Sequence, residues 1–220
     1  MLFRLANNKD PDSFASRLRR RRMDGFAKLL ELFDEPVRVL DVGGTVRFWR
    51  THKPSMPKRL DITLLNLYTR DPSELEGVRA VTGDARRMVQ FADSDFDVCF
   101  SNSVIEHLGN LEDQRLMAAE IRRVATSYWV QTPNLYFPVE PHFLVPGWQF
   151  MPVALRSWLH RRIRLGWMHP QPDRALARAD VEQIRLLDAR EYRGLFPDGE
   201  IRRERVGPLT KSLIAVRPAT

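Results

Sequence analysis

The sequence predicts an α/β fold in which a mostly parallel sheet is covered by helices. Short apolar runs of strand length alternate with longer amphipathic segments of helical spacing along the chain. One of these runs, residues 37–42, contains an acid and opens into the paired glycines Gly43 and Gly44. A buried parallel strand delivers a tight turn of this kind to the carboxyl edge of a sheet, where ligands of open α/β sheets bind.

Residues 1–35 are expected to form an N-terminal helical segment. Between residues 12 and 34 apolar side chains recur at roughly helical spacing, and Asp12 or Ser13 can cap the start of the helix. The recurring side chains are Phe14, Leu18, Phe26, Leu29, Leu30 and Phe33. Residues 34–36, an Asp-Glu-Pro sequence, stop the helix just before the first strand.

The central elements follow in alternation. Strands are predicted at residues 62–67, 78–82 and 97–101, and a helix at about 111–125 precedes a fifth strand at 128–131. Because strands alternate with helices, we expect right-handed crossovers between parallel strands.

The chain closes with a short helix and a hairpin. The helix is expected at residues 188–196, and the two strands at 201–206 and 212–217. The connection at 207–210, Gly-Pro-Leu-Thr, is typical of a turn.

An insertion at residues 134–175 interrupts the alternation of strands and helices. The stretch 133–170 is rich in prolines and aromatic residues, and it is too long for a simple turn, so we expect a functional cover. Within it, residues 152–165 are predicted to form a basic amphipathic helix. Its apolar side chains are Val153, Leu155, Trp158, Leu159 and Ile163, and its basic ones are Arg156, Arg161, Arg162 and Arg164.

The composition indicates a single globular domain, residues 1–220, with 43% hydrophobic and 29% charged residues. A net charge of +7 raises the question of nucleic-acid binding, but the run at 17–22 has no interleaved aromatic residues. We therefore expect a solvated helix face there and no nucleic-acid partner. The single cysteine, Cys99, lies in an apolar run and is predicted to be a buried, inert thiol.

The N-terminal residues lack the apolar stretch of a signal peptide. No apolar run approaches the ~20 residues that a membrane-spanning helix needs. A cytoplasmic location is therefore expected.

Polar motifs stand at the ends of the successive predicted strands. Asn66 ends the second strand, residues 83–85 (Gly-Asp-Ala) follow the third, and Ser101 and Asn102 end the fourth, with Glu106-His107 just beyond. In this order the motifs resemble those of the class I S-adenosylmethionine-dependent methyltransferases, in particular the small-molecule group known as methyltransferase type 11.

The resemblance covers residues 37–135 well and 188–217 by pattern. It implies a Rossmann-like, seven-stranded sheet whose last strand is antiparallel, and S-adenosyl-L-methionine as the cofactor. The implied activity is methylation, with oxygen as the expected atom, of a small-molecule, glycan or lipid-linked acceptor. The competing hypothesis is a non-catalytic cofactor-binding or scaffold protein with this fold, because fold does not determine function.

The resemblance also implies which residues bind the cofactor. In the family the first motif cradles the methionine part, the acid after the second strand holds the ribose, the third motif meets the adenine, and the fourth strand runs beneath the methionine. The matching residues here are Asp41, Gly43, Gly44, Asn66, Asp84, Ala85, Ser101 and Asn102. The chain departs from the pattern in having Gly44 next to Gly43 and an amide at Asn66. Taken alone, Asp41 and Asp84 are equally typical of residues that cap a turn or a helix.

Candidate catalytic residues follow the fourth strand. Ser103, Glu106 and His107 have i, i+3, i+4 spacing, so a helical turn would group them on one face. His107 would take a proton from a hydroxyl and Glu106 would orient it. The alternative is that Glu106 pairs locally and His107 packs under the adenine. Related enzymes of the ubiquinone pathway have a metal-binding acid at the position of Ser103, so no metal is expected here.

Four polar residues lie at the end of the fifth strand and in the segment after it, at the carboxyl edge of the sheet, and they are the candidate substrate contacts. They are Gln131, Asn134, Tyr136 and His142. We expect Tyr136 and His142 to point toward His107, beneath the insertion. The alternatives are a proline-stiffened loop that satisfies its own backbone and, for residues 152–165, a helix that lies on an anionic membrane and presents a lipid-linked acceptor.

Overall fold

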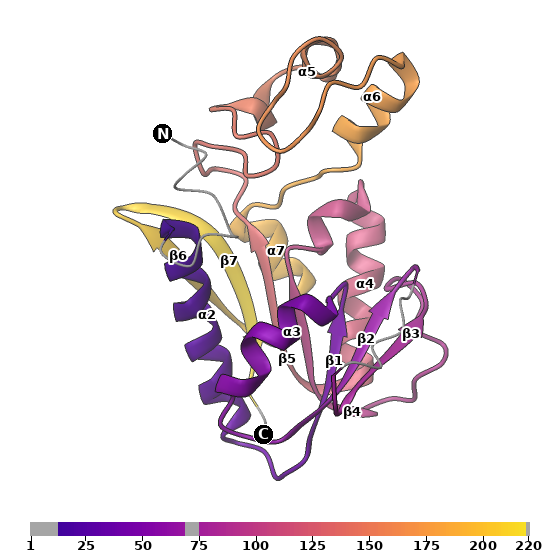
Figure 1. Ribbon diagram of the computed structural model, residues 1–220, viewed down its shortest axis with the longest axis vertical. Coiled ribbons are helices and arrows are strands. Elements are labelled where there is room, and N and C mark those ends of the chain that lie inside the picture. The colour runs from indigo at the N-terminus through magenta and orange to yellow at the C-terminus, as the bar shows by residue number, and fades with distance from the viewer. Residues whose placement is uncertain (1–12, 69–74, 219–220) are drawn as a thin grey trace.

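The computed structural model describes residues 13–68 and 75–218 of the chain. These residues form one seven-stranded sheet with the strand order β3-β2-β1-β4-β5-β7-β6 (Figure 1). The strands are β1 (Val37–Val42), β2 (Leu60–Asn66), β3 (Val78–Thr82), β4 (Phe96–Asn102), β5 (Ala125–Pro133), β6 (Glu200–Val206) and β7 (Leu209–Arg217).

The pairing confirms the predicted topology. Strands β1 to β5 are parallel to one another, whereas β7 runs antiparallel to both β5 and β6. The order reverses between β1 and β4, and at such a point the loops leaving two adjacent strands diverge and open a crevice. The glycine turn after β1 and the polar residues after β4 both lie at this crevice.

Helices cover both faces of the sheet, as predicted. On one face lie α2 (Phe14–Leu30) and α3 (Val46–His52), and on the other α4 (Leu111–Val124) and α7 (Ala189–Leu195). Short 3₁₀ turns occur at η1 (Lys53–Ser55), η2 (Ile105–Leu108) and η3 (Trp148–Phe150). Among the described residues, no helix has both the length and the apolar character needed to cross a bilayer.

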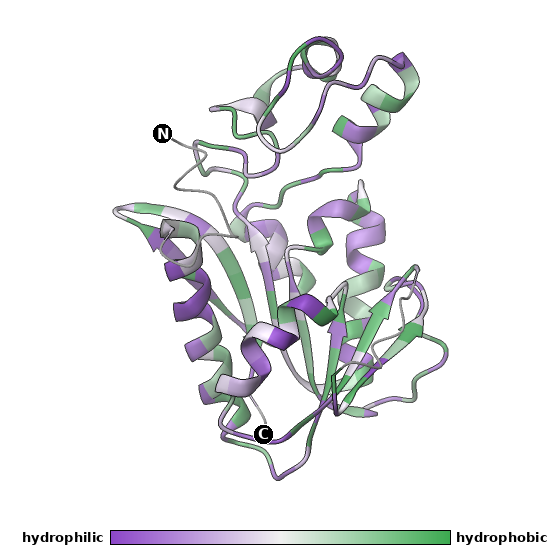
Figure 2. Ribbon diagram, in the orientation of Figure 1, coloured by the Kyte–Doolittle hydropathy of each residue, from purple (hydrophilic) through white to green (hydrophobic). Residues whose placement is uncertain are grey.

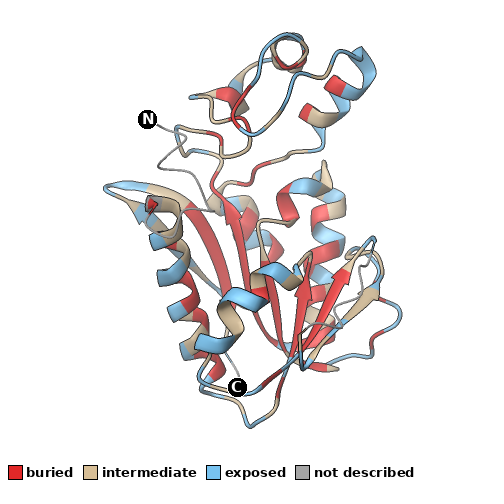
Figure 3. Ribbon diagram, in the orientation of Figure 1, coloured by how far each residue is buried: buried red, intermediate tan, exposed pale blue. Residues whose placement is uncertain are grey.

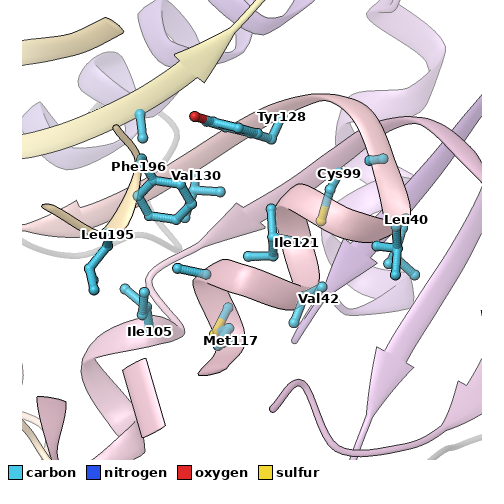
Figure 4. Packing of buried hydrophobic residues seen from close by; sticks show 14 of the residues in the cluster. Leu40, Val42, Cys99, Ile105, Met117, Ile121, Tyr128, Val130, Leu195 and Phe196 are labelled. Atoms are coloured by element: carbon cyan, nitrogen blue, oxygen red, sulfur yellow. The ribbon is translucent and has the colours of Figure 1, made fainter. Parts of the chain in front are cut away.

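Each face has its own apolar core, and the central strands are buried between them (Figures 2 and 3). On the α4 and α7 side, Met117 and Ile121 pack with Tyr128 and Phe196, whose rings lie 5.1 Å apart (Figure 4). Cys99 is buried in this cluster, and burial raises the pKa of its thiol, which confirms the prediction of an inert cysteine.

The insertion packs as a small unit above the carboxyl ends of the parallel strands (Figure 1). It contains α5 (Val153–His160) and α6 (Arg174–Glu182) around a cluster of Phe143, Trp148, Leu165 and Val181. Because Val181 belongs to α6, this unit extends beyond residue 175, the end that the sequence predicts for the insertion.

Some boundaries differ from the predictions. Helix α2 begins at Phe14 with Ser13 as its N-cap, whose Oγ accepts a hydrogen bond from Ser16 N at 3.0 Å, while Asp12 lies outside the described residues. Helix α5 ends at His160 and not at 165. Helices α3 and α6, of seven and nine residues, are not among the predicted elements.

Candidate cofactor and acceptor site

The turn after β1 requires glycine at two consecutive positions. Gly43 has a positive φ of 77°, and its N–H donates to the carbonyl of Leu65 at 2.8 Å. A Cβ added at Gly43 would lie 2.5 Å from a Val104 methyl carbon, and one at Gly44 only 1.6 Å from the Asp41 carboxylate. The pair of adjacent glycines therefore lets the chain pass closely over Asp41.

Asp41 lies beneath this turn and not in open solvent. The side chain is buried, and Trp49 Nε1 donates to its Oδ2 at 2.6 Å. Burial raises the pKa of Asp41 to about 7, although the Trp49 hydrogen bond opposes the rise. The acid thus joins the end of β1 to α3 and supports the turn from below.

A hydrogen bond within the protein accounts for the amide at Asn66, where the family has an acid. Asn66 Nδ2 donates to the carbonyl of Gly44 at 2.9 Å, which links the end of β2 to the glycine turn. An ionised aspartate could not donate this hydrogen bond. The amide oxygen is the group that would accept from a ribose hydroxyl, so the predicted cofactor contact and the observed structural one use different atoms.

Asp84 and Ser101 are engaged within the protein. Asp84 accepts from the Arg86 side chain at 2.6 Å and from its backbone N–H at 2.9 Å, and Arg86 also pairs with Asp113. The side-chain hydrogen bond from Arg86 lowers the pKa of Asp84. Ser101 is buried, and its Oγ donates to the carbonyl of Val42. The alternative that Asp84 caps a helix is wrong, because a turn and not a helix follows it, and the adenine contacts of Asp84 and Ala85 remain predictions.

Two cavities adjoin the switch point. The first, of about 580 Å³, lies among α2, α3 and the ends of β1 and β4. The second, of about 610 Å³, lies among the ends of β4, β5 and β7 and the insertion. Arg19 and Asn102 line both cavities. Each volume is within the range of about 300–1,000 Å³ that is usual for small-molecule sites.

The first cavity fits part of the predicted cofactor set. Asp41, Gly43, Gly44 and Asn102 line it, together with residues of α2 and α3 that the sequence did not single out. Asn66, Asp84, Ala85 and Ser101 lie outside its lining. The predicted contacts to the methionine end of a cofactor would therefore lie in this cavity, whereas those to the ribose and adenine would form outside its lining.

One partner of a buried ion pair, Arg22, lines the second cavity. Arg22 Nη2 donates to both carboxylate oxygens of Glu204, at 3.0 and 2.9 Å. Arg22 Nη1 also donates to Asn102 Oδ1 and to Gln131 Oε1. The expectation that residues 17–22 form a solvated helix face is therefore wrong for Arg22, because α2 turns this side chain toward the β4 and β5 ends.

The candidate substrate contacts separate into two groups. Gln131, Asn134 and His142 line the second cavity, and Gln131 also accepts a hydrogen bond from Ser103 Oγ at 2.9 Å. Tyr136 lies outside the lining of both cavities: it is exposed and stacks on Phe150. The expectation that Tyr136 points toward His107 is therefore not met, because residues 134–137 turn the ring outward.

The predicted helical turn after β4 is also different. Ser103 has a positive φ of 58° and precedes η2, so it does not share a helix face with the other two residues. Glu106 is fully buried, and its Oε2 accepts from Thr132 Oγ1 at 3.0 Å. Burial raises the pKa of Glu106 to about 7.

The partner of His107 is His142, which the insertion carries over the sheet edge. The Nε2 atoms of the two rings are 3.2 Å apart, and His142 Nδ1 lies 2.5 Å from the buried carboxylate of Glu140. Burial, with the charge of His142, lowers the pKa of His107 to about 4, and water at its exposed edge screens part of this effect. For His142, burial acts to lower the pKa, but Glu140 and Glu106 outweigh it and the pKa is raised.

Comparison with known proteins supports the same family. Residues 60–127 match a family model described as a methyltransferase domain. An uncharacterized protein of Mycobacterium tuberculosis (strain H37Rv) is 28% identical over 88 residues, which are 40% of this chain and 30% of that protein. The match thus spans less than a third of the length of this curated relative.

Solved structures share the fold. The 1,6-didemethyltoxoflavin-N1-methyltransferase of Burkholderia thailandensis, with bound S-adenosylhomocysteine, has a TM-score of 0.56 at 12% identity and covers 90% of this chain and 76% of its own. A Rhodobacter sphaeroides chain ascribed to the Zn-dependent alcohol dehydrogenases has a TM-score of 0.60 at 13% identity, with 91% and 89% covered. Such likeness shows the fold alone. The matched segment and the shared fold agree with the order of the motifs, which resembles that of the class I methyltransferases that use S-adenosyl-L-methionine as the cofactor.

Proposed function

We propose that this protein transfers a methyl group from S-adenosylmethionine to an oxygen of a small-molecule, glycan or lipid-linked acceptor. The observation that carries the proposal is the pair of adjoining cavities that share Arg19 and Asn102. One is lined by the predicted cofactor loop and the other by the insertion. Methyl transfer needs donor and acceptor held in line at short distance, and two cavities with a common wall supply this arrangement.

The cofactor, when bound, supplies a methyl group on a positively charged sulfur. Gly43 and Gly44 let the backbone approach it, and Asn102 lies at the boundary between the two cavities. His142 lines the acceptor cavity and His107 lies beside it, and one of the two imidazoles would receive the proton of an acceptor hydroxyl as the new C–O bond forms. Glu140 fixes the orientation of His142 from behind.

The lining of the second cavity favours an acceptor with both polar and apolar parts. Gln131, Asn134 and Lys211 contribute amide and ammonium groups, while Phe137 and Leu144 contribute apolar surface. A ring or sugar hydroxyl attached to an apolar portion would match this mixture. The cover of prolines and aromatic residues would also exclude water, which strengthens polar contacts inside the site.

The Gly44→Ala variant tests cofactor binding. Because its Cβ would overlap the Asp41 carboxylate, the turn must move, and we expect S-adenosylhomocysteine to bind at least about tenfold more weakly. Isothermal calorimetry measures the affinity. Gly194→Ala is the matched control, because a Cβ there meets no atom within 4 Å. Unchanged affinity for S-adenosylhomocysteine in Gly44→Ala would contradict the proposal that this glycine turn binds the cofactor.

Turnover separates the enzyme from the non-catalytic alternative. A screen of hydroxyl-bearing acceptors with labelled S-adenosylmethionine should release S-adenosylhomocysteine only when an acceptor is present. Cofactor binding without turnover across phenolic, sugar and lipid-linked acceptors would favour the scaffold hypothesis. Methylation of amines but not of hydroxyls would contradict the choice of oxygen.

The lipid-linked form of the acceptor rests on the surface of α5. Leu155 and Trp158 are exposed one turn apart, and the Arg162 guanidinium lies 4.4 Å above the Trp158 ring. Exposed apolar side chains beside arginines favour an anionic membrane surface.

We therefore expect the Leu155→Ser/Trp158→Ser double variant to bind vesicles of anionic phospholipid at least about tenfold more weakly than the parent protein. Vesicle sedimentation measures the partition coefficient. Leu116→Ser, which removes an equally exposed leucine from α4, outside the insertion, is the control. If the parent, the double variant and Leu116→Ser partition equally, or if none of them binds anionic vesicles, the lipid-linked acceptor is ruled out and a freely diffusing acceptor remains.

A further inference from the structure

Three potential metal ligands from two distant segments converge beside the acceptor cavity. They are Glu106 and His107, on η2, and His142, in the insertion. One ligand atom from each lies within 4.8 Å of the others. The two Nε2 atoms are 3.2 Å apart, which is the separation expected of two nitrogens bound at about 2.0–2.1 Å to the same ion.

The Glu106 carboxylate is the second, independent observation. Its side chain is fully buried, and Oε2 accepts from Thr132. Within the described residues, Oε1 has no hydrogen-bond donor, although it is shielded from solvent. A buried carboxylate oxygen without a partner is unfavourable, and a cation at this position would satisfy it.

His142 is oriented as metal-bound histidines usually are. Its Nδ1 lies 2.5 Å from Glu140 Oε1, and the other oxygen of Glu140 accepts the backbone N–H groups of His142 and Phe143 at 2.9 and 2.7 Å. The carboxylate therefore favours hydrogen on Nδ1 and turns the lone pair of Nε2 toward His107. A carboxylate behind a histidine in this way fixes the ring and strengthens it as a ligand.

We propose that Glu106, His107 and His142 bind one divalent transition-metal ion, with Glu140 as the supporting carboxylate. Two imidazoles and one carboxylate suit Zn²⁺ and neighbouring first-row ions, whereas Mg²⁺ prefers a shell of oxygens. The sequence led us to expect no metal, because Ser103 replaces an upstream acid. The third ligand comes instead from the insertion, 35 residues along the chain from His107.

A role for the ion in catalysis rests on the proposed function, but its binding does not. Because His142 lines the acceptor cavity, the remaining coordination positions would face the acceptor. An acceptor oxygen bound there would have a lowered pKa and would lose its proton to solvent before it attacks the methyl carbon. The ion would then take over the activation of the hydroxyl from the free imidazoles.

Cobalt spectroscopy tests the site without any cofactor or acceptor. Chelator-treated protein titrated with Co²⁺ should develop the visible absorption band of a four- or five-coordinate ion, and Zn²⁺ should abolish it in a 1:1 ratio. We expect His142→Ala to weaken Co²⁺ binding by about 100-fold or more and Glu140→Gln by about 10–100-fold. Glu106→Gln, which keeps the shape of the side chain, should also weaken it by at least about tenfold.

Controls separate this site from adventitious binding and from misfolding. His169→Ala removes an exposed histidine elsewhere in the insertion and should leave Co²⁺ affinity unchanged. Circular dichroism and thermal unfolding show whether each metal-free variant is folded. If His142→Ala does not fold, the Co²⁺ affinity of Glu106→Gln is used in its place. The proposal is overturned if no band develops, or if the band is equally strong in His142→Ala, Glu106→Gln and His169→Ala.

The test of the metal site can fail independently of the test of the proposed methyltransferase function. Binding of S-adenosylhomocysteine to the chelated protein is measured separately, by calorimetry. Metal binding without cofactor binding would contradict the methyltransferase proposal and leave the metal site standing. Cofactor binding and turnover in chelated protein, with no Co²⁺ band, would support the methyltransferase and remove the metal site.

Discussion

The Asp41→Asn variant should lose the largest single part of the pH dependence of stability that the parent protein shows between acidic and neutral pH, while the buried Glu106 keeps its own contribution. Burial raises the pKa of Asp41 from 3.8 to about 7 in the fold. The folded state therefore holds a proton that the unfolded state has released in this window, and the free energy of unfolding falls as the pH rises. A change of this size corresponds to about 4 kcal/mol.

Asparagine cannot ionise, but it keeps an oxygen that can accept from Trp49 Nε1. The stability of Asp41→Asn relative to the parent should therefore increase by about 4 kcal/mol between about pH 3 and about pH 8, with the gap constant above that range. Urea unfolding of the cofactor-free proteins at a series of pH values measures this difference. Asp61→Asn removes an exposed acid from β2 and is the control. Parallel stability profiles of the parent and Asp41→Asn would show that the buried acid is ionised in the fold without penalty.

Replacing Arg22 with methionine should destabilise the protein by about 3 kcal/mol. The change leaves the carboxylate of Glu204, which is 9% exposed, without its bidentate partner and removes the donor to Asn102 and Gln131. Lys211 remains 3.4 Å from Glu204, so we place the effect at the lower end of what a broken buried ion pair costs. Urea denaturation measures the loss, and Arg21→Met, on the exposed side of α2, should change stability by less than about 0.5 kcal/mol.

A double variant distinguishes a lost ion pair from lost packing. If the destabilisation comes from an uncompensated Glu204 charge, Arg22→Met/Glu204→Leu should be more stable than the sum of the single changes predicts, by about 2 kcal/mol. Additive effects would show that the Arg22 stem, and not its charge, holds α2 against the sheet. The same variants should alter acceptor binding more than cofactor binding, because Arg22 lines only the second cavity.

Local features of the structure could be predicted because their causes are local. Residues 37–42 form β1 with the predicted bounds, and residues 78–82 form β3, because apolar runs bounded by turn residues specify a strand without reference to the rest of the chain. Ser13 and Asp188 cap α2 and α7 through side chains that bond to backbone groups two or three residues away. The parallel sheet and its antiparallel last strand then followed from the alternation of elements and from the family resemblance.

The site was predicted in part. The glycine turn and Asn102 line a cavity at the switch point, and His142 does lie beside His107. Tyr136 was assigned to the pocket because it belongs to the same loop, yet a single loop can turn neighbouring side chains in opposite directions. Ser103 was grouped with Glu106 and His107 by helical spacing, but a positive φ breaks the helix at that position.

The sequence by itself determined the succession of the strands, the glycine turn and the carboxyl edge at which polar residues gather. Only the tertiary structure decided which of these residues face one another. Arg22 and Glu204 are 182 positions apart, and no periodicity relates them, so the run at 17–22 predicts a solvated face until β6 and β7 pack against α2. His142, Glu140 and Glu106 meet because the insertion folds back over β4 and β5. That path is set by the packing of Phe143 and Trp148, side chains whose apolar character predicts burial but not position.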